Sequence, residues 1–219
     1  IKKIEIPEET HAGAVLVFDD YNKKKNIAIL SENRFYKENP LLSPVFYLEK
    51  ALNKKHSLII GDLDEVLKKS SDVIIMPDKG KIQKKMHAKL TGWLQKGGTL
   101  IRFSGPKLAN NKSEFLSVEE SLTSIRFHGE VLNLEKKLSI APFENNSIFK
   151  GITIPKDIEI QKQLITSTTS DKTKVLAYLS DKTPLITIRK VGNGSIVLYH
   201  VTANNRWSNL PLSSIFADM

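Results

Sequence analysis

The sequence of 219 residues contains no cysteine, and this absence removes several kinds of functional site. Without thiols the chain forms no disulfide, no thiolate zinc site, no iron–sulfur cluster and no cysteine nucleophile. The sequence also has no run of about 18 consecutive apolar residues, so we expect no transmembrane helix within it. Its chemistry therefore has to come from hydroxyl, carboxylate, imidazole or basic side chains.

Motifs for phosphates and metals are also missing. The segment Asp78-Lys79-Gly80-Lys81 holds a single glycine and does not match the phosphate-binding loop pattern. The acidic pair Asp19–Asp20 lacks the spacing of a calcium loop, and the five histidines never fall at the spacing of metal ligands. We therefore expect neither a metal nor a cofactor.

Arginine is scarce in a chain that is otherwise basic. The net charge is +9, but only five of the 33 basic residues are arginine, and the lysines occur in scattered pairs. Proteins that read nucleic acids rely on arginine for bidentate contacts and on aromatic stacking. The charge therefore predicts a lysine-rich, solvated surface and no specific nucleic-acid binding. Weak association with polyanions or with an anionic membrane surface stays open.

The remaining composition is that of a globular protein, with 40% hydrophobic and 26% charged residues. The length predicts one domain over residues 1–219, with a β-rich insertion at 107–170 where polar stretches alternate with short apolar ones. Because the chain starts at Ile1 and not at a methionine, we expect it to be a segment of a longer protein.

The first half alternates strands with helices. Continuous apolar runs, typical of strands buried on both faces of a parallel sheet, occur at Asn26–Leu30, Ser57–Ile60, Asp72–Met76 and Thr99–Phe103. Ser43 followed by Pro44 predicts one helix start and Asp62 another. An apolar stripe at helical spacing predicts a third helix, with the residues Ile82, Met86, Leu90, Trp93 and Leu94. Four strands joined by three helical crossovers predict an α/β fold with a doubly wound, mostly parallel sheet.

The second half is richer in β-structure. Within the insertion, Glu130–Leu134 and Glu159–Leu164 are candidate strands. Beyond it, Lys174–Leu179 predicts a strand, and Gly192-Asn193-Gly194 predicts a hairpin between the runs on either side. Helical spacing of Ile215, Phe216 and Met219 predicts a final amphipathic helix.

In a doubly wound sheet, ligands bind beyond the carboxyl ends of the strands. Ser104 follows the fourth strand and His200 ends the last one, so the two could approach each other and carry out acyl transfer. Against this, Arg102 and Pro106 stand where a nucleophile elbow needs small residues. A structural serine and a half-buried structural histidine are the alternative, and we expect Trp207 to pack rather than to stack on a ligand.

Three stretches of the chain resemble a family of large bacterial membrane proteins. They read AGAVLVFDDYNKKKNIAILSEN…PLLSPVFYLEKAL, then DVIIMPD…LTGWLQKGGTLIRFSGPKLA, and finally DKTPLITIRKVGNGSIVLYHVTANNRWSNLPLSSIFADM. The family is that of the aerotolerance-operon (Bat-type) proteins with an N-terminal double-transmembrane domain. The resemblance implies a flavodoxin-like, class I glutamine amidotransferase-like domain that lies beside a von Willebrand factor A-like domain. Active members of that fold carry a cysteine near the position of Ser104, and a glutamate at the position of Thr202, two residues after the histidine equivalent to His200. Both are missing here.

The resemblance thus implies a non-catalytic interaction module of a membrane-anchored bacterial envelope protein, on the periplasmic side of the inner membrane. Its partners would be other proteins or neighbouring domains of its own chain, and membrane segments would lie outside these residues. Two alternatives are a serine hydrolase or amidase that uses Ser104 and His200, and a receptor domain for a small polar ligand. We expect a residual groove framed by Ser104, His200 and Asn209, with Asp78 as an acid that could orient the histidine.

Overall fold

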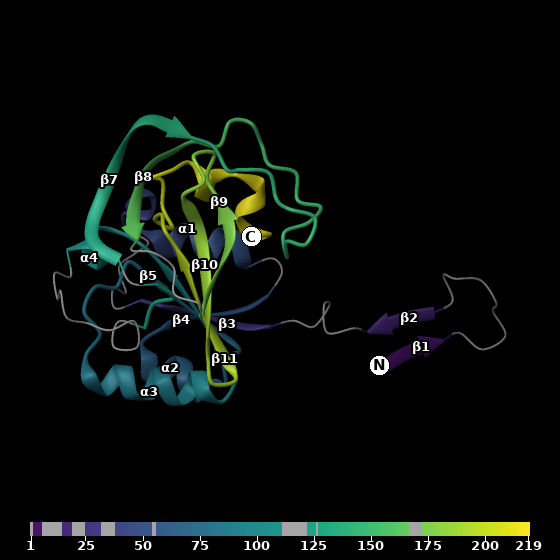
Figure 1. Ribbon diagram of the computed structural model, residues 1–219. Helices are drawn as coiled ribbons and strands as arrows, with labels where there is room; N and C mark the ends of the chain where they lie inside the picture. Colours follow the sequence, from purple (N-terminus) through teal and green to yellow (C-terminus); the bar gives the residue numbers. More distant parts are fainter. Residues whose placement is uncertain are drawn as a thin grey trace.

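The computed structural model describes residues 2–5, 15–18, 25–31, 38–53, 56–110, 122–125, 127–166 and 172–219. Its centre is a seven-stranded sheet with helices on both faces (Figure 1). The strands lie in the order β4 (Ser57–Gly61), β3 (Asn26–Leu30), β5 (Val73–Pro77), β6 (Thr99–Phe103), β11 (Gly194–Tyr199), β10 (Pro184–Val191) and β9 (Thr173–Tyr178). The first five run parallel to one another, whereas β10 is antiparallel to both of its neighbours, β11 and β9.

The four predicted parallel strands are confirmed, as is the α/β class with a mostly parallel sheet. They follow from a repeated arrangement of short apolar runs separated by helices, which are α1 (Pro44–Leu52), α2 (Leu63–Lys68) and α3 (Lys84–Gln95). Successive side chains of a strand point to opposite faces, so each strand supplies both faces of the sheet. In β3, for example, Ile27 and Ile29 belong to one hydrophobic cluster and Ala28 to the other.

The two clusters are covered by different helices. The first cluster contains Val45 and Leu48 of α1 together with apolar residues near the C-terminus. The second contains Val66 of α2 with Leu90 and Leu94 of α3. Because both faces are covered, β5 and β6 are almost entirely removed from water, and polar groups collect beyond the ends of the strands.

The helix starts agree with the sequence prediction. Asp62 caps α2 in a reciprocal capping box: its carboxylate accepts a hydrogen bond from the Glu65 N–H, and the Glu65 carboxylate accepts one from the Asp62 N–H. Ser43 precedes α1 with Pro44 at the first helical position, but its side chain makes no capping hydrogen bond. The third helix begins at Lys84, so Ile82 lies just before it.

The predicted hairpin is also confirmed. Strands β10 and β11 pair antiparallel up to Val191 and Gly194, which leaves Gly192 and Asn193 as a two-residue loop. Gly192 has a φ of +58°, the sign that a type II′ turn needs at its first central position. The hairpin places β11 beside β6, in the middle of the sheet.

Two smaller sheets complete the described chain. Strands β7 (Phe127–Leu138) and β8 (Ile160–Thr166) pair antiparallel; β7 contains the candidate strand Glu130–Leu134, and β8 contains the candidate strand Glu159–Leu164 except for its first residue. This pair packs over α4 (Pro106–Ala109), where Leu108, Leu164 and Trp207 share a third hydrophobic cluster. Strands β1 (Lys2–Glu5) and β2 (Val15–Phe18) form a separate antiparallel pair.

The prediction of a final amphipathic helix was wrong. The chain instead makes two 3₁₀ turns, η4 (Leu210–Leu212) and η5 (Ser214–Ala217). Between them Ser213 adopts an extended conformation with φ −83° and ψ 156°, which interrupts any continuous helix. Ile215 and Phe216 are nevertheless buried, because the hydrophobic spacing is satisfied by a single 3₁₀ turn.

Two glycines provide a matched test of the packing of β11 against α3. A Cβ at Gly194 would come within 2.3 Å of the Gly98 carbonyl oxygen and 2.4 Å of the Leu94 carbonyl oxygen, whereas one at Gly92, inside α3, would meet nothing within 4 Å. We expect Gly194→Ala to lower the free energy of unfolding by about 1–3 kcal/mol through overpacking. Gly92→Ala should raise it by about 0.5–1 kcal/mol through helix propensity. Urea unfolding measures both; equal effects would contradict the close approach of β11 to α3.

Candidate functional site

A pocket of about 350 Å³ lies where β3, β4 and β5 end. Its walls come from the residues that follow these strands and from the start of α1. Apolar residues form much of the lining: Leu30, Leu42, Pro44, Val45, Leu63, Met76, Pro77 and Met86. Polar residues converge on it from several segments: Ser31, Asn39, Ser43, Asp62, Asp78, Lys79 and Lys107. A largely apolar concavity with a few polar groups is the usual form of a small-molecule site.

Asp78 is the most tightly positioned polar group of this pocket. It follows β5 with a φ of +37°, a conformation that aspartate adopts more readily than most residues. Its Oδ1 accepts hydrogen bonds from the N–H groups of Lys107 (3.0 Å) and Leu108 (3.1 Å), at the start of α4. The structure gives Oδ2 no hydrogen-bond partner among the described residues. One carboxylate oxygen therefore holds the turn, and the other can take a ligand.

Glycines allow the turns after β5 and β6 to lie against each other. A Cβ at Gly105 would fall 2.2 Å from the Asp78 carboxyl carbon, and one at Gly80 would fall 2.6 Å from the Lys107 carbonyl oxygen. Any other residue at either position would push the turns apart. The pocket thus has a rigid wall made from two interlocked turns.

Arg102 strengthens this wall from inside the protein. It lies on β6, has no exposed surface, and donates to the carbonyl oxygen of Lys79 and to that of Leu122 (3.5 Å). Burial lowers the pKa of Arg102 to about 10, and the nearby Asp78 charge acts in the opposite direction. The guanidinium therefore stays charged at neutral pH and ties the turn after β5 to the segment that contains Leu122.

The Asp78 carboxyl is partly desolvated by burial. Burial raises its pKa, and this effect exceeds the opposing hydrogen bonds from Leu108 and Lys107 and the charges of Lys107 and Arg102. An ionised carboxylate in such surroundings gains from any further hydrogen-bond donor. The pocket therefore favours a ligand that brings an O–H or N–H group to Oδ2.

The predicted pair of Ser104 and His200 is not hydrogen-bonded in the structure. Both residues have no exposed surface. The Ser104 hydroxyl donates to the carbonyl oxygen of Tyr199 (2.7 Å), and the His200 ring contacts Thr187 and Leu164 instead of Ser104. Neither lines the pocket described above. Ser104 and His200 were predicted to frame a groove, but they do not frame this pocket.

His200 is instead part of a buried hydrogen-bonded chain. Its Nδ1 lies 3.3 Å from the Leu164 carbonyl oxygen, which can only accept, so Nδ1 carries the proton. Its Nε2 then accepts from the Thr187 hydroxyl at 3.0 Å, and Thr187 in turn accepts from Ser124 at 2.7 Å. Burial lowers the pKa of His200 to about 4, so the ring is neutral at physiological pH. This chain attaches β8 to the central sheet.

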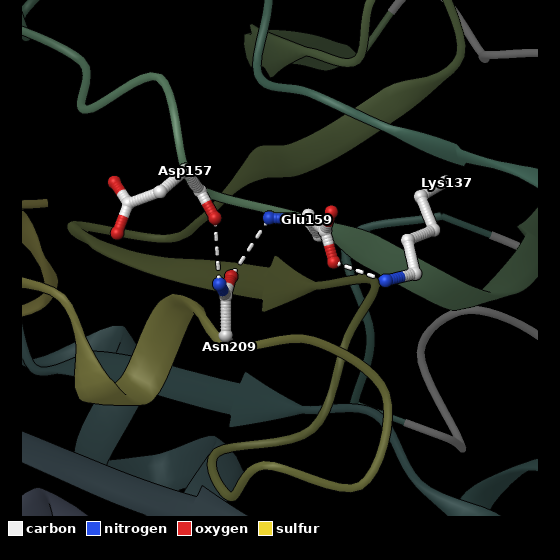
Figure 2. Close-up of polar contacts among 4 residues, drawn as sticks. All are labelled: Lys137, Asp157, Glu159 and Asn209. Carbon is white, nitrogen blue, oxygen red and sulfur yellow. Dashed lines mark hydrogen bonds and ion pairs between the residues drawn. The ribbon is translucent and has the colours of Figure 1, made fainter.

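Asn209 has a similar structural role (Figure 2). Its Oδ1 accepts from the Glu159 N–H and its Nδ2 donates to the Asp157 carbonyl oxygen, both at 2.7 Å. Glu159 also forms an exposed ion pair with Lys137 of β7. The side chain that we expected in a groove thus fastens the chain entering β8 to the C-terminal segment. Trp207 is buried against Leu164 and Leu198, as predicted for a packing residue.

Of the four residues singled out from the sequence, only Asp78 lines the pocket. Lys107 and the positioning role of Arg102 were not predicted from the sequence. A detectable signal for Arg102 was present: an arginine in the middle of a buried apolar strand needs partners for its charge. No comparable signal marked Lys107, which reaches the pocket through the turn after β6.

Among the described residues there is no group of three or more histidine, aspartate or glutamate residues placed to hold a metal ion. None of the helices described is both long and apolar enough to span a bilayer.

Comparison with known proteins shows the fold. No family model matches the chain, and no curated protein matches it. A cytoplasmic protein from Salmonella typhimurium, STM3548, is similar in structure, with a TM-score of 0.63, 14% sequence identity, and coverage of 89% of this chain and 95% of that one. The N-terminal domain of mmIFT52 gives a TM-score of 0.58, 11% identity, and coverage of 89% and 93%.

A beta-galactosidase from Bacillus circulans sp. alkalophilus is also similar, with a TM-score of 0.59 and 18% identity. The match covers 80% of this chain but only 28% of the beta-galactosidase. At such identities the likeness extends to the α/β fold and not to activity.

The buried imidazole leads to a prediction about pH. The unfolded state binds a proton at His200 below about pH 6.5, whereas the folded state resists protonation down to about pH 4. The neutral ring therefore makes its full contribution to the free energy of unfolding above pH 6.5. As the pH falls to about 4, the free energy of unfolding decreases by about 3 kcal/mol. Urea unfolding of the wild type and His200→Gln should show their stability difference shrinking by this amount over that range. A difference that does not change with pH would contradict the assignment.

Proposed function

We propose that the chain is a non-catalytic, flavodoxin-like domain of the class I glutamine amidotransferase-like type that binds a small organic molecule at the pocket beside Asp78. The ligand carries hydroxyl or amino groups that donate to the carboxylate, together with an apolar part. Of the alternatives considered from the sequence, this corresponds to the receptor domain, and it keeps the expectation that the domain is not an enzyme.

The position of the pocket in the sheet carries the proposal. The five parallel strands can be numbered 1 to 5 in chain order, as β3, β4, β5, β6 and β11. Their order across the sheet is then 2-1-3-4-5. This is the flavodoxin-like order, in which the chain reverses direction across the sheet between the first and third strands. The pocket lies beside the ends of those strands, β3 and β5. Ligands of open α/β sheets bind at such a switch point.

The chemistry of the pocket supports the ligand class. Asp78 presents Oδ2 from a turn that is fixed by two backbone hydrogen bonds, so little conformational freedom is lost on binding. Leu30, Leu42 and Met86 line the pocket without being fully buried, and they offer an apolar surface to the rest of the ligand. The serine hydrolase alternative has less support, because the described hydrogen bonds of Ser104 and His200 lead to structural partners.

The wider context follows the resemblance to the Bat-type proteins and is also a proposal. In that context the domain belongs to a membrane-anchored bacterial envelope protein, faces the periplasm, and contacts a von Willebrand factor A-like domain or other protein partners. Protease accessibility of the full-length protein in spheroplasts tests the membrane side. Protection of this domain from external protease would contradict a periplasmic location.

Ligand binding is tested by thermal unfolding in the presence of sorbitol, galactose, butylamine or butyrate. We expect at least one of the three donor-bearing compounds to raise Tm by about 5 °C when present at about 100 times Kd, and butyrate to have no effect. Asp78→Asn retains an acceptor for the N–H groups of Lys107 and Leu108 but removes the charge. It should weaken binding about tenfold or more.

A matched pair of variants separates the pocket from the remaining surface. Leu42 is 58% exposed at the pocket, and Leu212 is 65% exposed and is not part of its lining. Leu42→Trp should block binding without loss of folding, and Leu212→Trp should leave binding unchanged. Binding that survives Leu42→Trp and Asp78→Asn, or no binding by any of the donor-bearing compounds, would overturn the proposal.

A further inference from the structure

A second surface, independent of the pocket, lies at the free edge of the central sheet. Strand β9 is the last strand in the sheet order, and among the described residues it pairs as a strand only with β10. An edge strand presents backbone N–H and C=O groups that another strand can pair with. Between Thr173 and Tyr178, the edge of β9 therefore provides a backbone template over residues 174–177.

The chain itself already uses one end of this edge. Ile140 forms an antiparallel bridge with Leu179, supported by hydrogen bonds from the Ala141 N–H to the Tyr178 carbonyl and from the Ser180 N–H to the Ser139 carbonyl, both 2.9 Å. Beyond Ala141, the described residues of this segment form no further strand pairing with β9. Strand pairing along this edge thus begins beside Leu179 and ends at Ala141.

A cleft of about 860 Å³ opens where this pairing ends. One wall is the edge of β9, from Lys174 to Ser180, and the other is the segment 141–148. Figure 1 shows the long connection after β7 passing beside β9. The outer wall is anchored in the hydrophobic core by Phe143 and Phe149, whose ring centroids lie 5.2 Å apart.

The cleft has exposed apolar groups that have no covering segment among the described residues. Ile148 is 68% exposed and Tyr178 is 41% exposed, and both line the cleft. Val175 and Leu176 line it from β9. A peptide in extended conformation would direct alternate side chains toward this apolar surface.

The charges around the cleft indicate which kind of peptide it can bind. The cleft adjoins a pocket of about 530 Å³ that shares Pro142, Phe143 and Glu144 with it. Together the two are lined by one acidic residue, Glu144, and by four lysines, Lys150, Lys156, Lys174 and Lys182. Pairing of two copies of this chain along β9 would bring like charges together, which opposes a homodimer through this edge. An acidic strand would instead be attracted.

We propose that the cleft between β9 and the segment 141–148 binds an extended, acidic peptide segment of a partner protein by strand addition. The peptide backbone pairs with the free edge of β9, beyond the bridge that Ile140 makes. Its apolar side chains lie against Val175, Leu176 and Ile148, and its carboxylates face the four lysines. Main-chain hydrogen bonds provide affinity, and the side-chain pattern provides specificity.

The test uses NMR amide shifts of the whole chain titrated with an acetylated and amidated hexapeptide of alternating glutamate and valine. We expect saturable shifts confined to residues 141–148 and 174–180, and at least tenfold weaker binding of the same peptide with lysine in place of glutamate. The variant Lys174→Glu/Lys182→Glu alters exposed side chains and should reverse this preference. Its matched control is Lys96→Glu/Lys190→Glu, two exposed lysines outside the cleft, which should leave the preference unchanged.

Backbone pairing is tested with two N-methylated versions of the acidic peptide. One is methylated at the glutamate nitrogens and the other at the valine nitrogens, so each blocks a different set of alternate N–H groups. Only one of these sets faces β9, so one peptide should lose binding at least tenfold and the other should retain it. Several results would overturn the proposal. They are absence of shifts at about 1 mM peptide, equal binding of the acidic and basic peptides, shifts outside the cleft, equal behaviour of the two methylated peptides, or a dimer that forms through β9.

Discussion

Burial of both faces of the central strands is the constraint on which the structure depends. Since Ile74, Met76 and Leu100 have almost no exposed surface, no ligand can reach the middle of the sheet. Functional polar groups collect beyond the strand ends, where the backbone also has to satisfy its own hydrogen bonds. The turns after β5 and β6 meet this demand together, through Asp78 and the start of α4. The candidate pocket is a consequence of that arrangement.

The same constraint explains why residues in positions typical of catalysis are structural here. Ser104 and His200 both follow strands at the carboxyl edge, but β8 and the segment around Ser124 cover this part of the edge. Once covered, each polar atom needs a partner inside the protein, because an unsatisfied buried group is costly. The imidazole finds Thr187 and Leu164, and the serine finds Tyr199. The open part of the edge lies elsewhere, between β3 and β5.

How much the sequence could predict depended on the range of the interactions. The strand at Asn26–Leu30 and the turn at Gly192 are determined by neighbouring residues, and both were predicted correctly. The position of Asp78 beyond a strand end was also recoverable. The partners of Ser104 and His200 were not, because they lie 95 and 36 residues away in the chain. The final helix was predicted from hydrophobic spacing alone, which did not register the extended conformation at Ser213.

The place of β11 in the sheet has a consequence for the order in which the chain folds. Strands β3, β4, β5 and β6 lie in the N-terminal half and are joined by local crossovers, but β6 receives its second neighbour only from residues 194–199. During synthesis, β6 therefore remains an edge strand with apolar side chains on both faces until residues 194–199 have left the ribosome. Such an intermediate is open to pairing with other chains. Productive folding then depends on how quickly the β10–β11 hairpin, itself a local structure, reaches this edge.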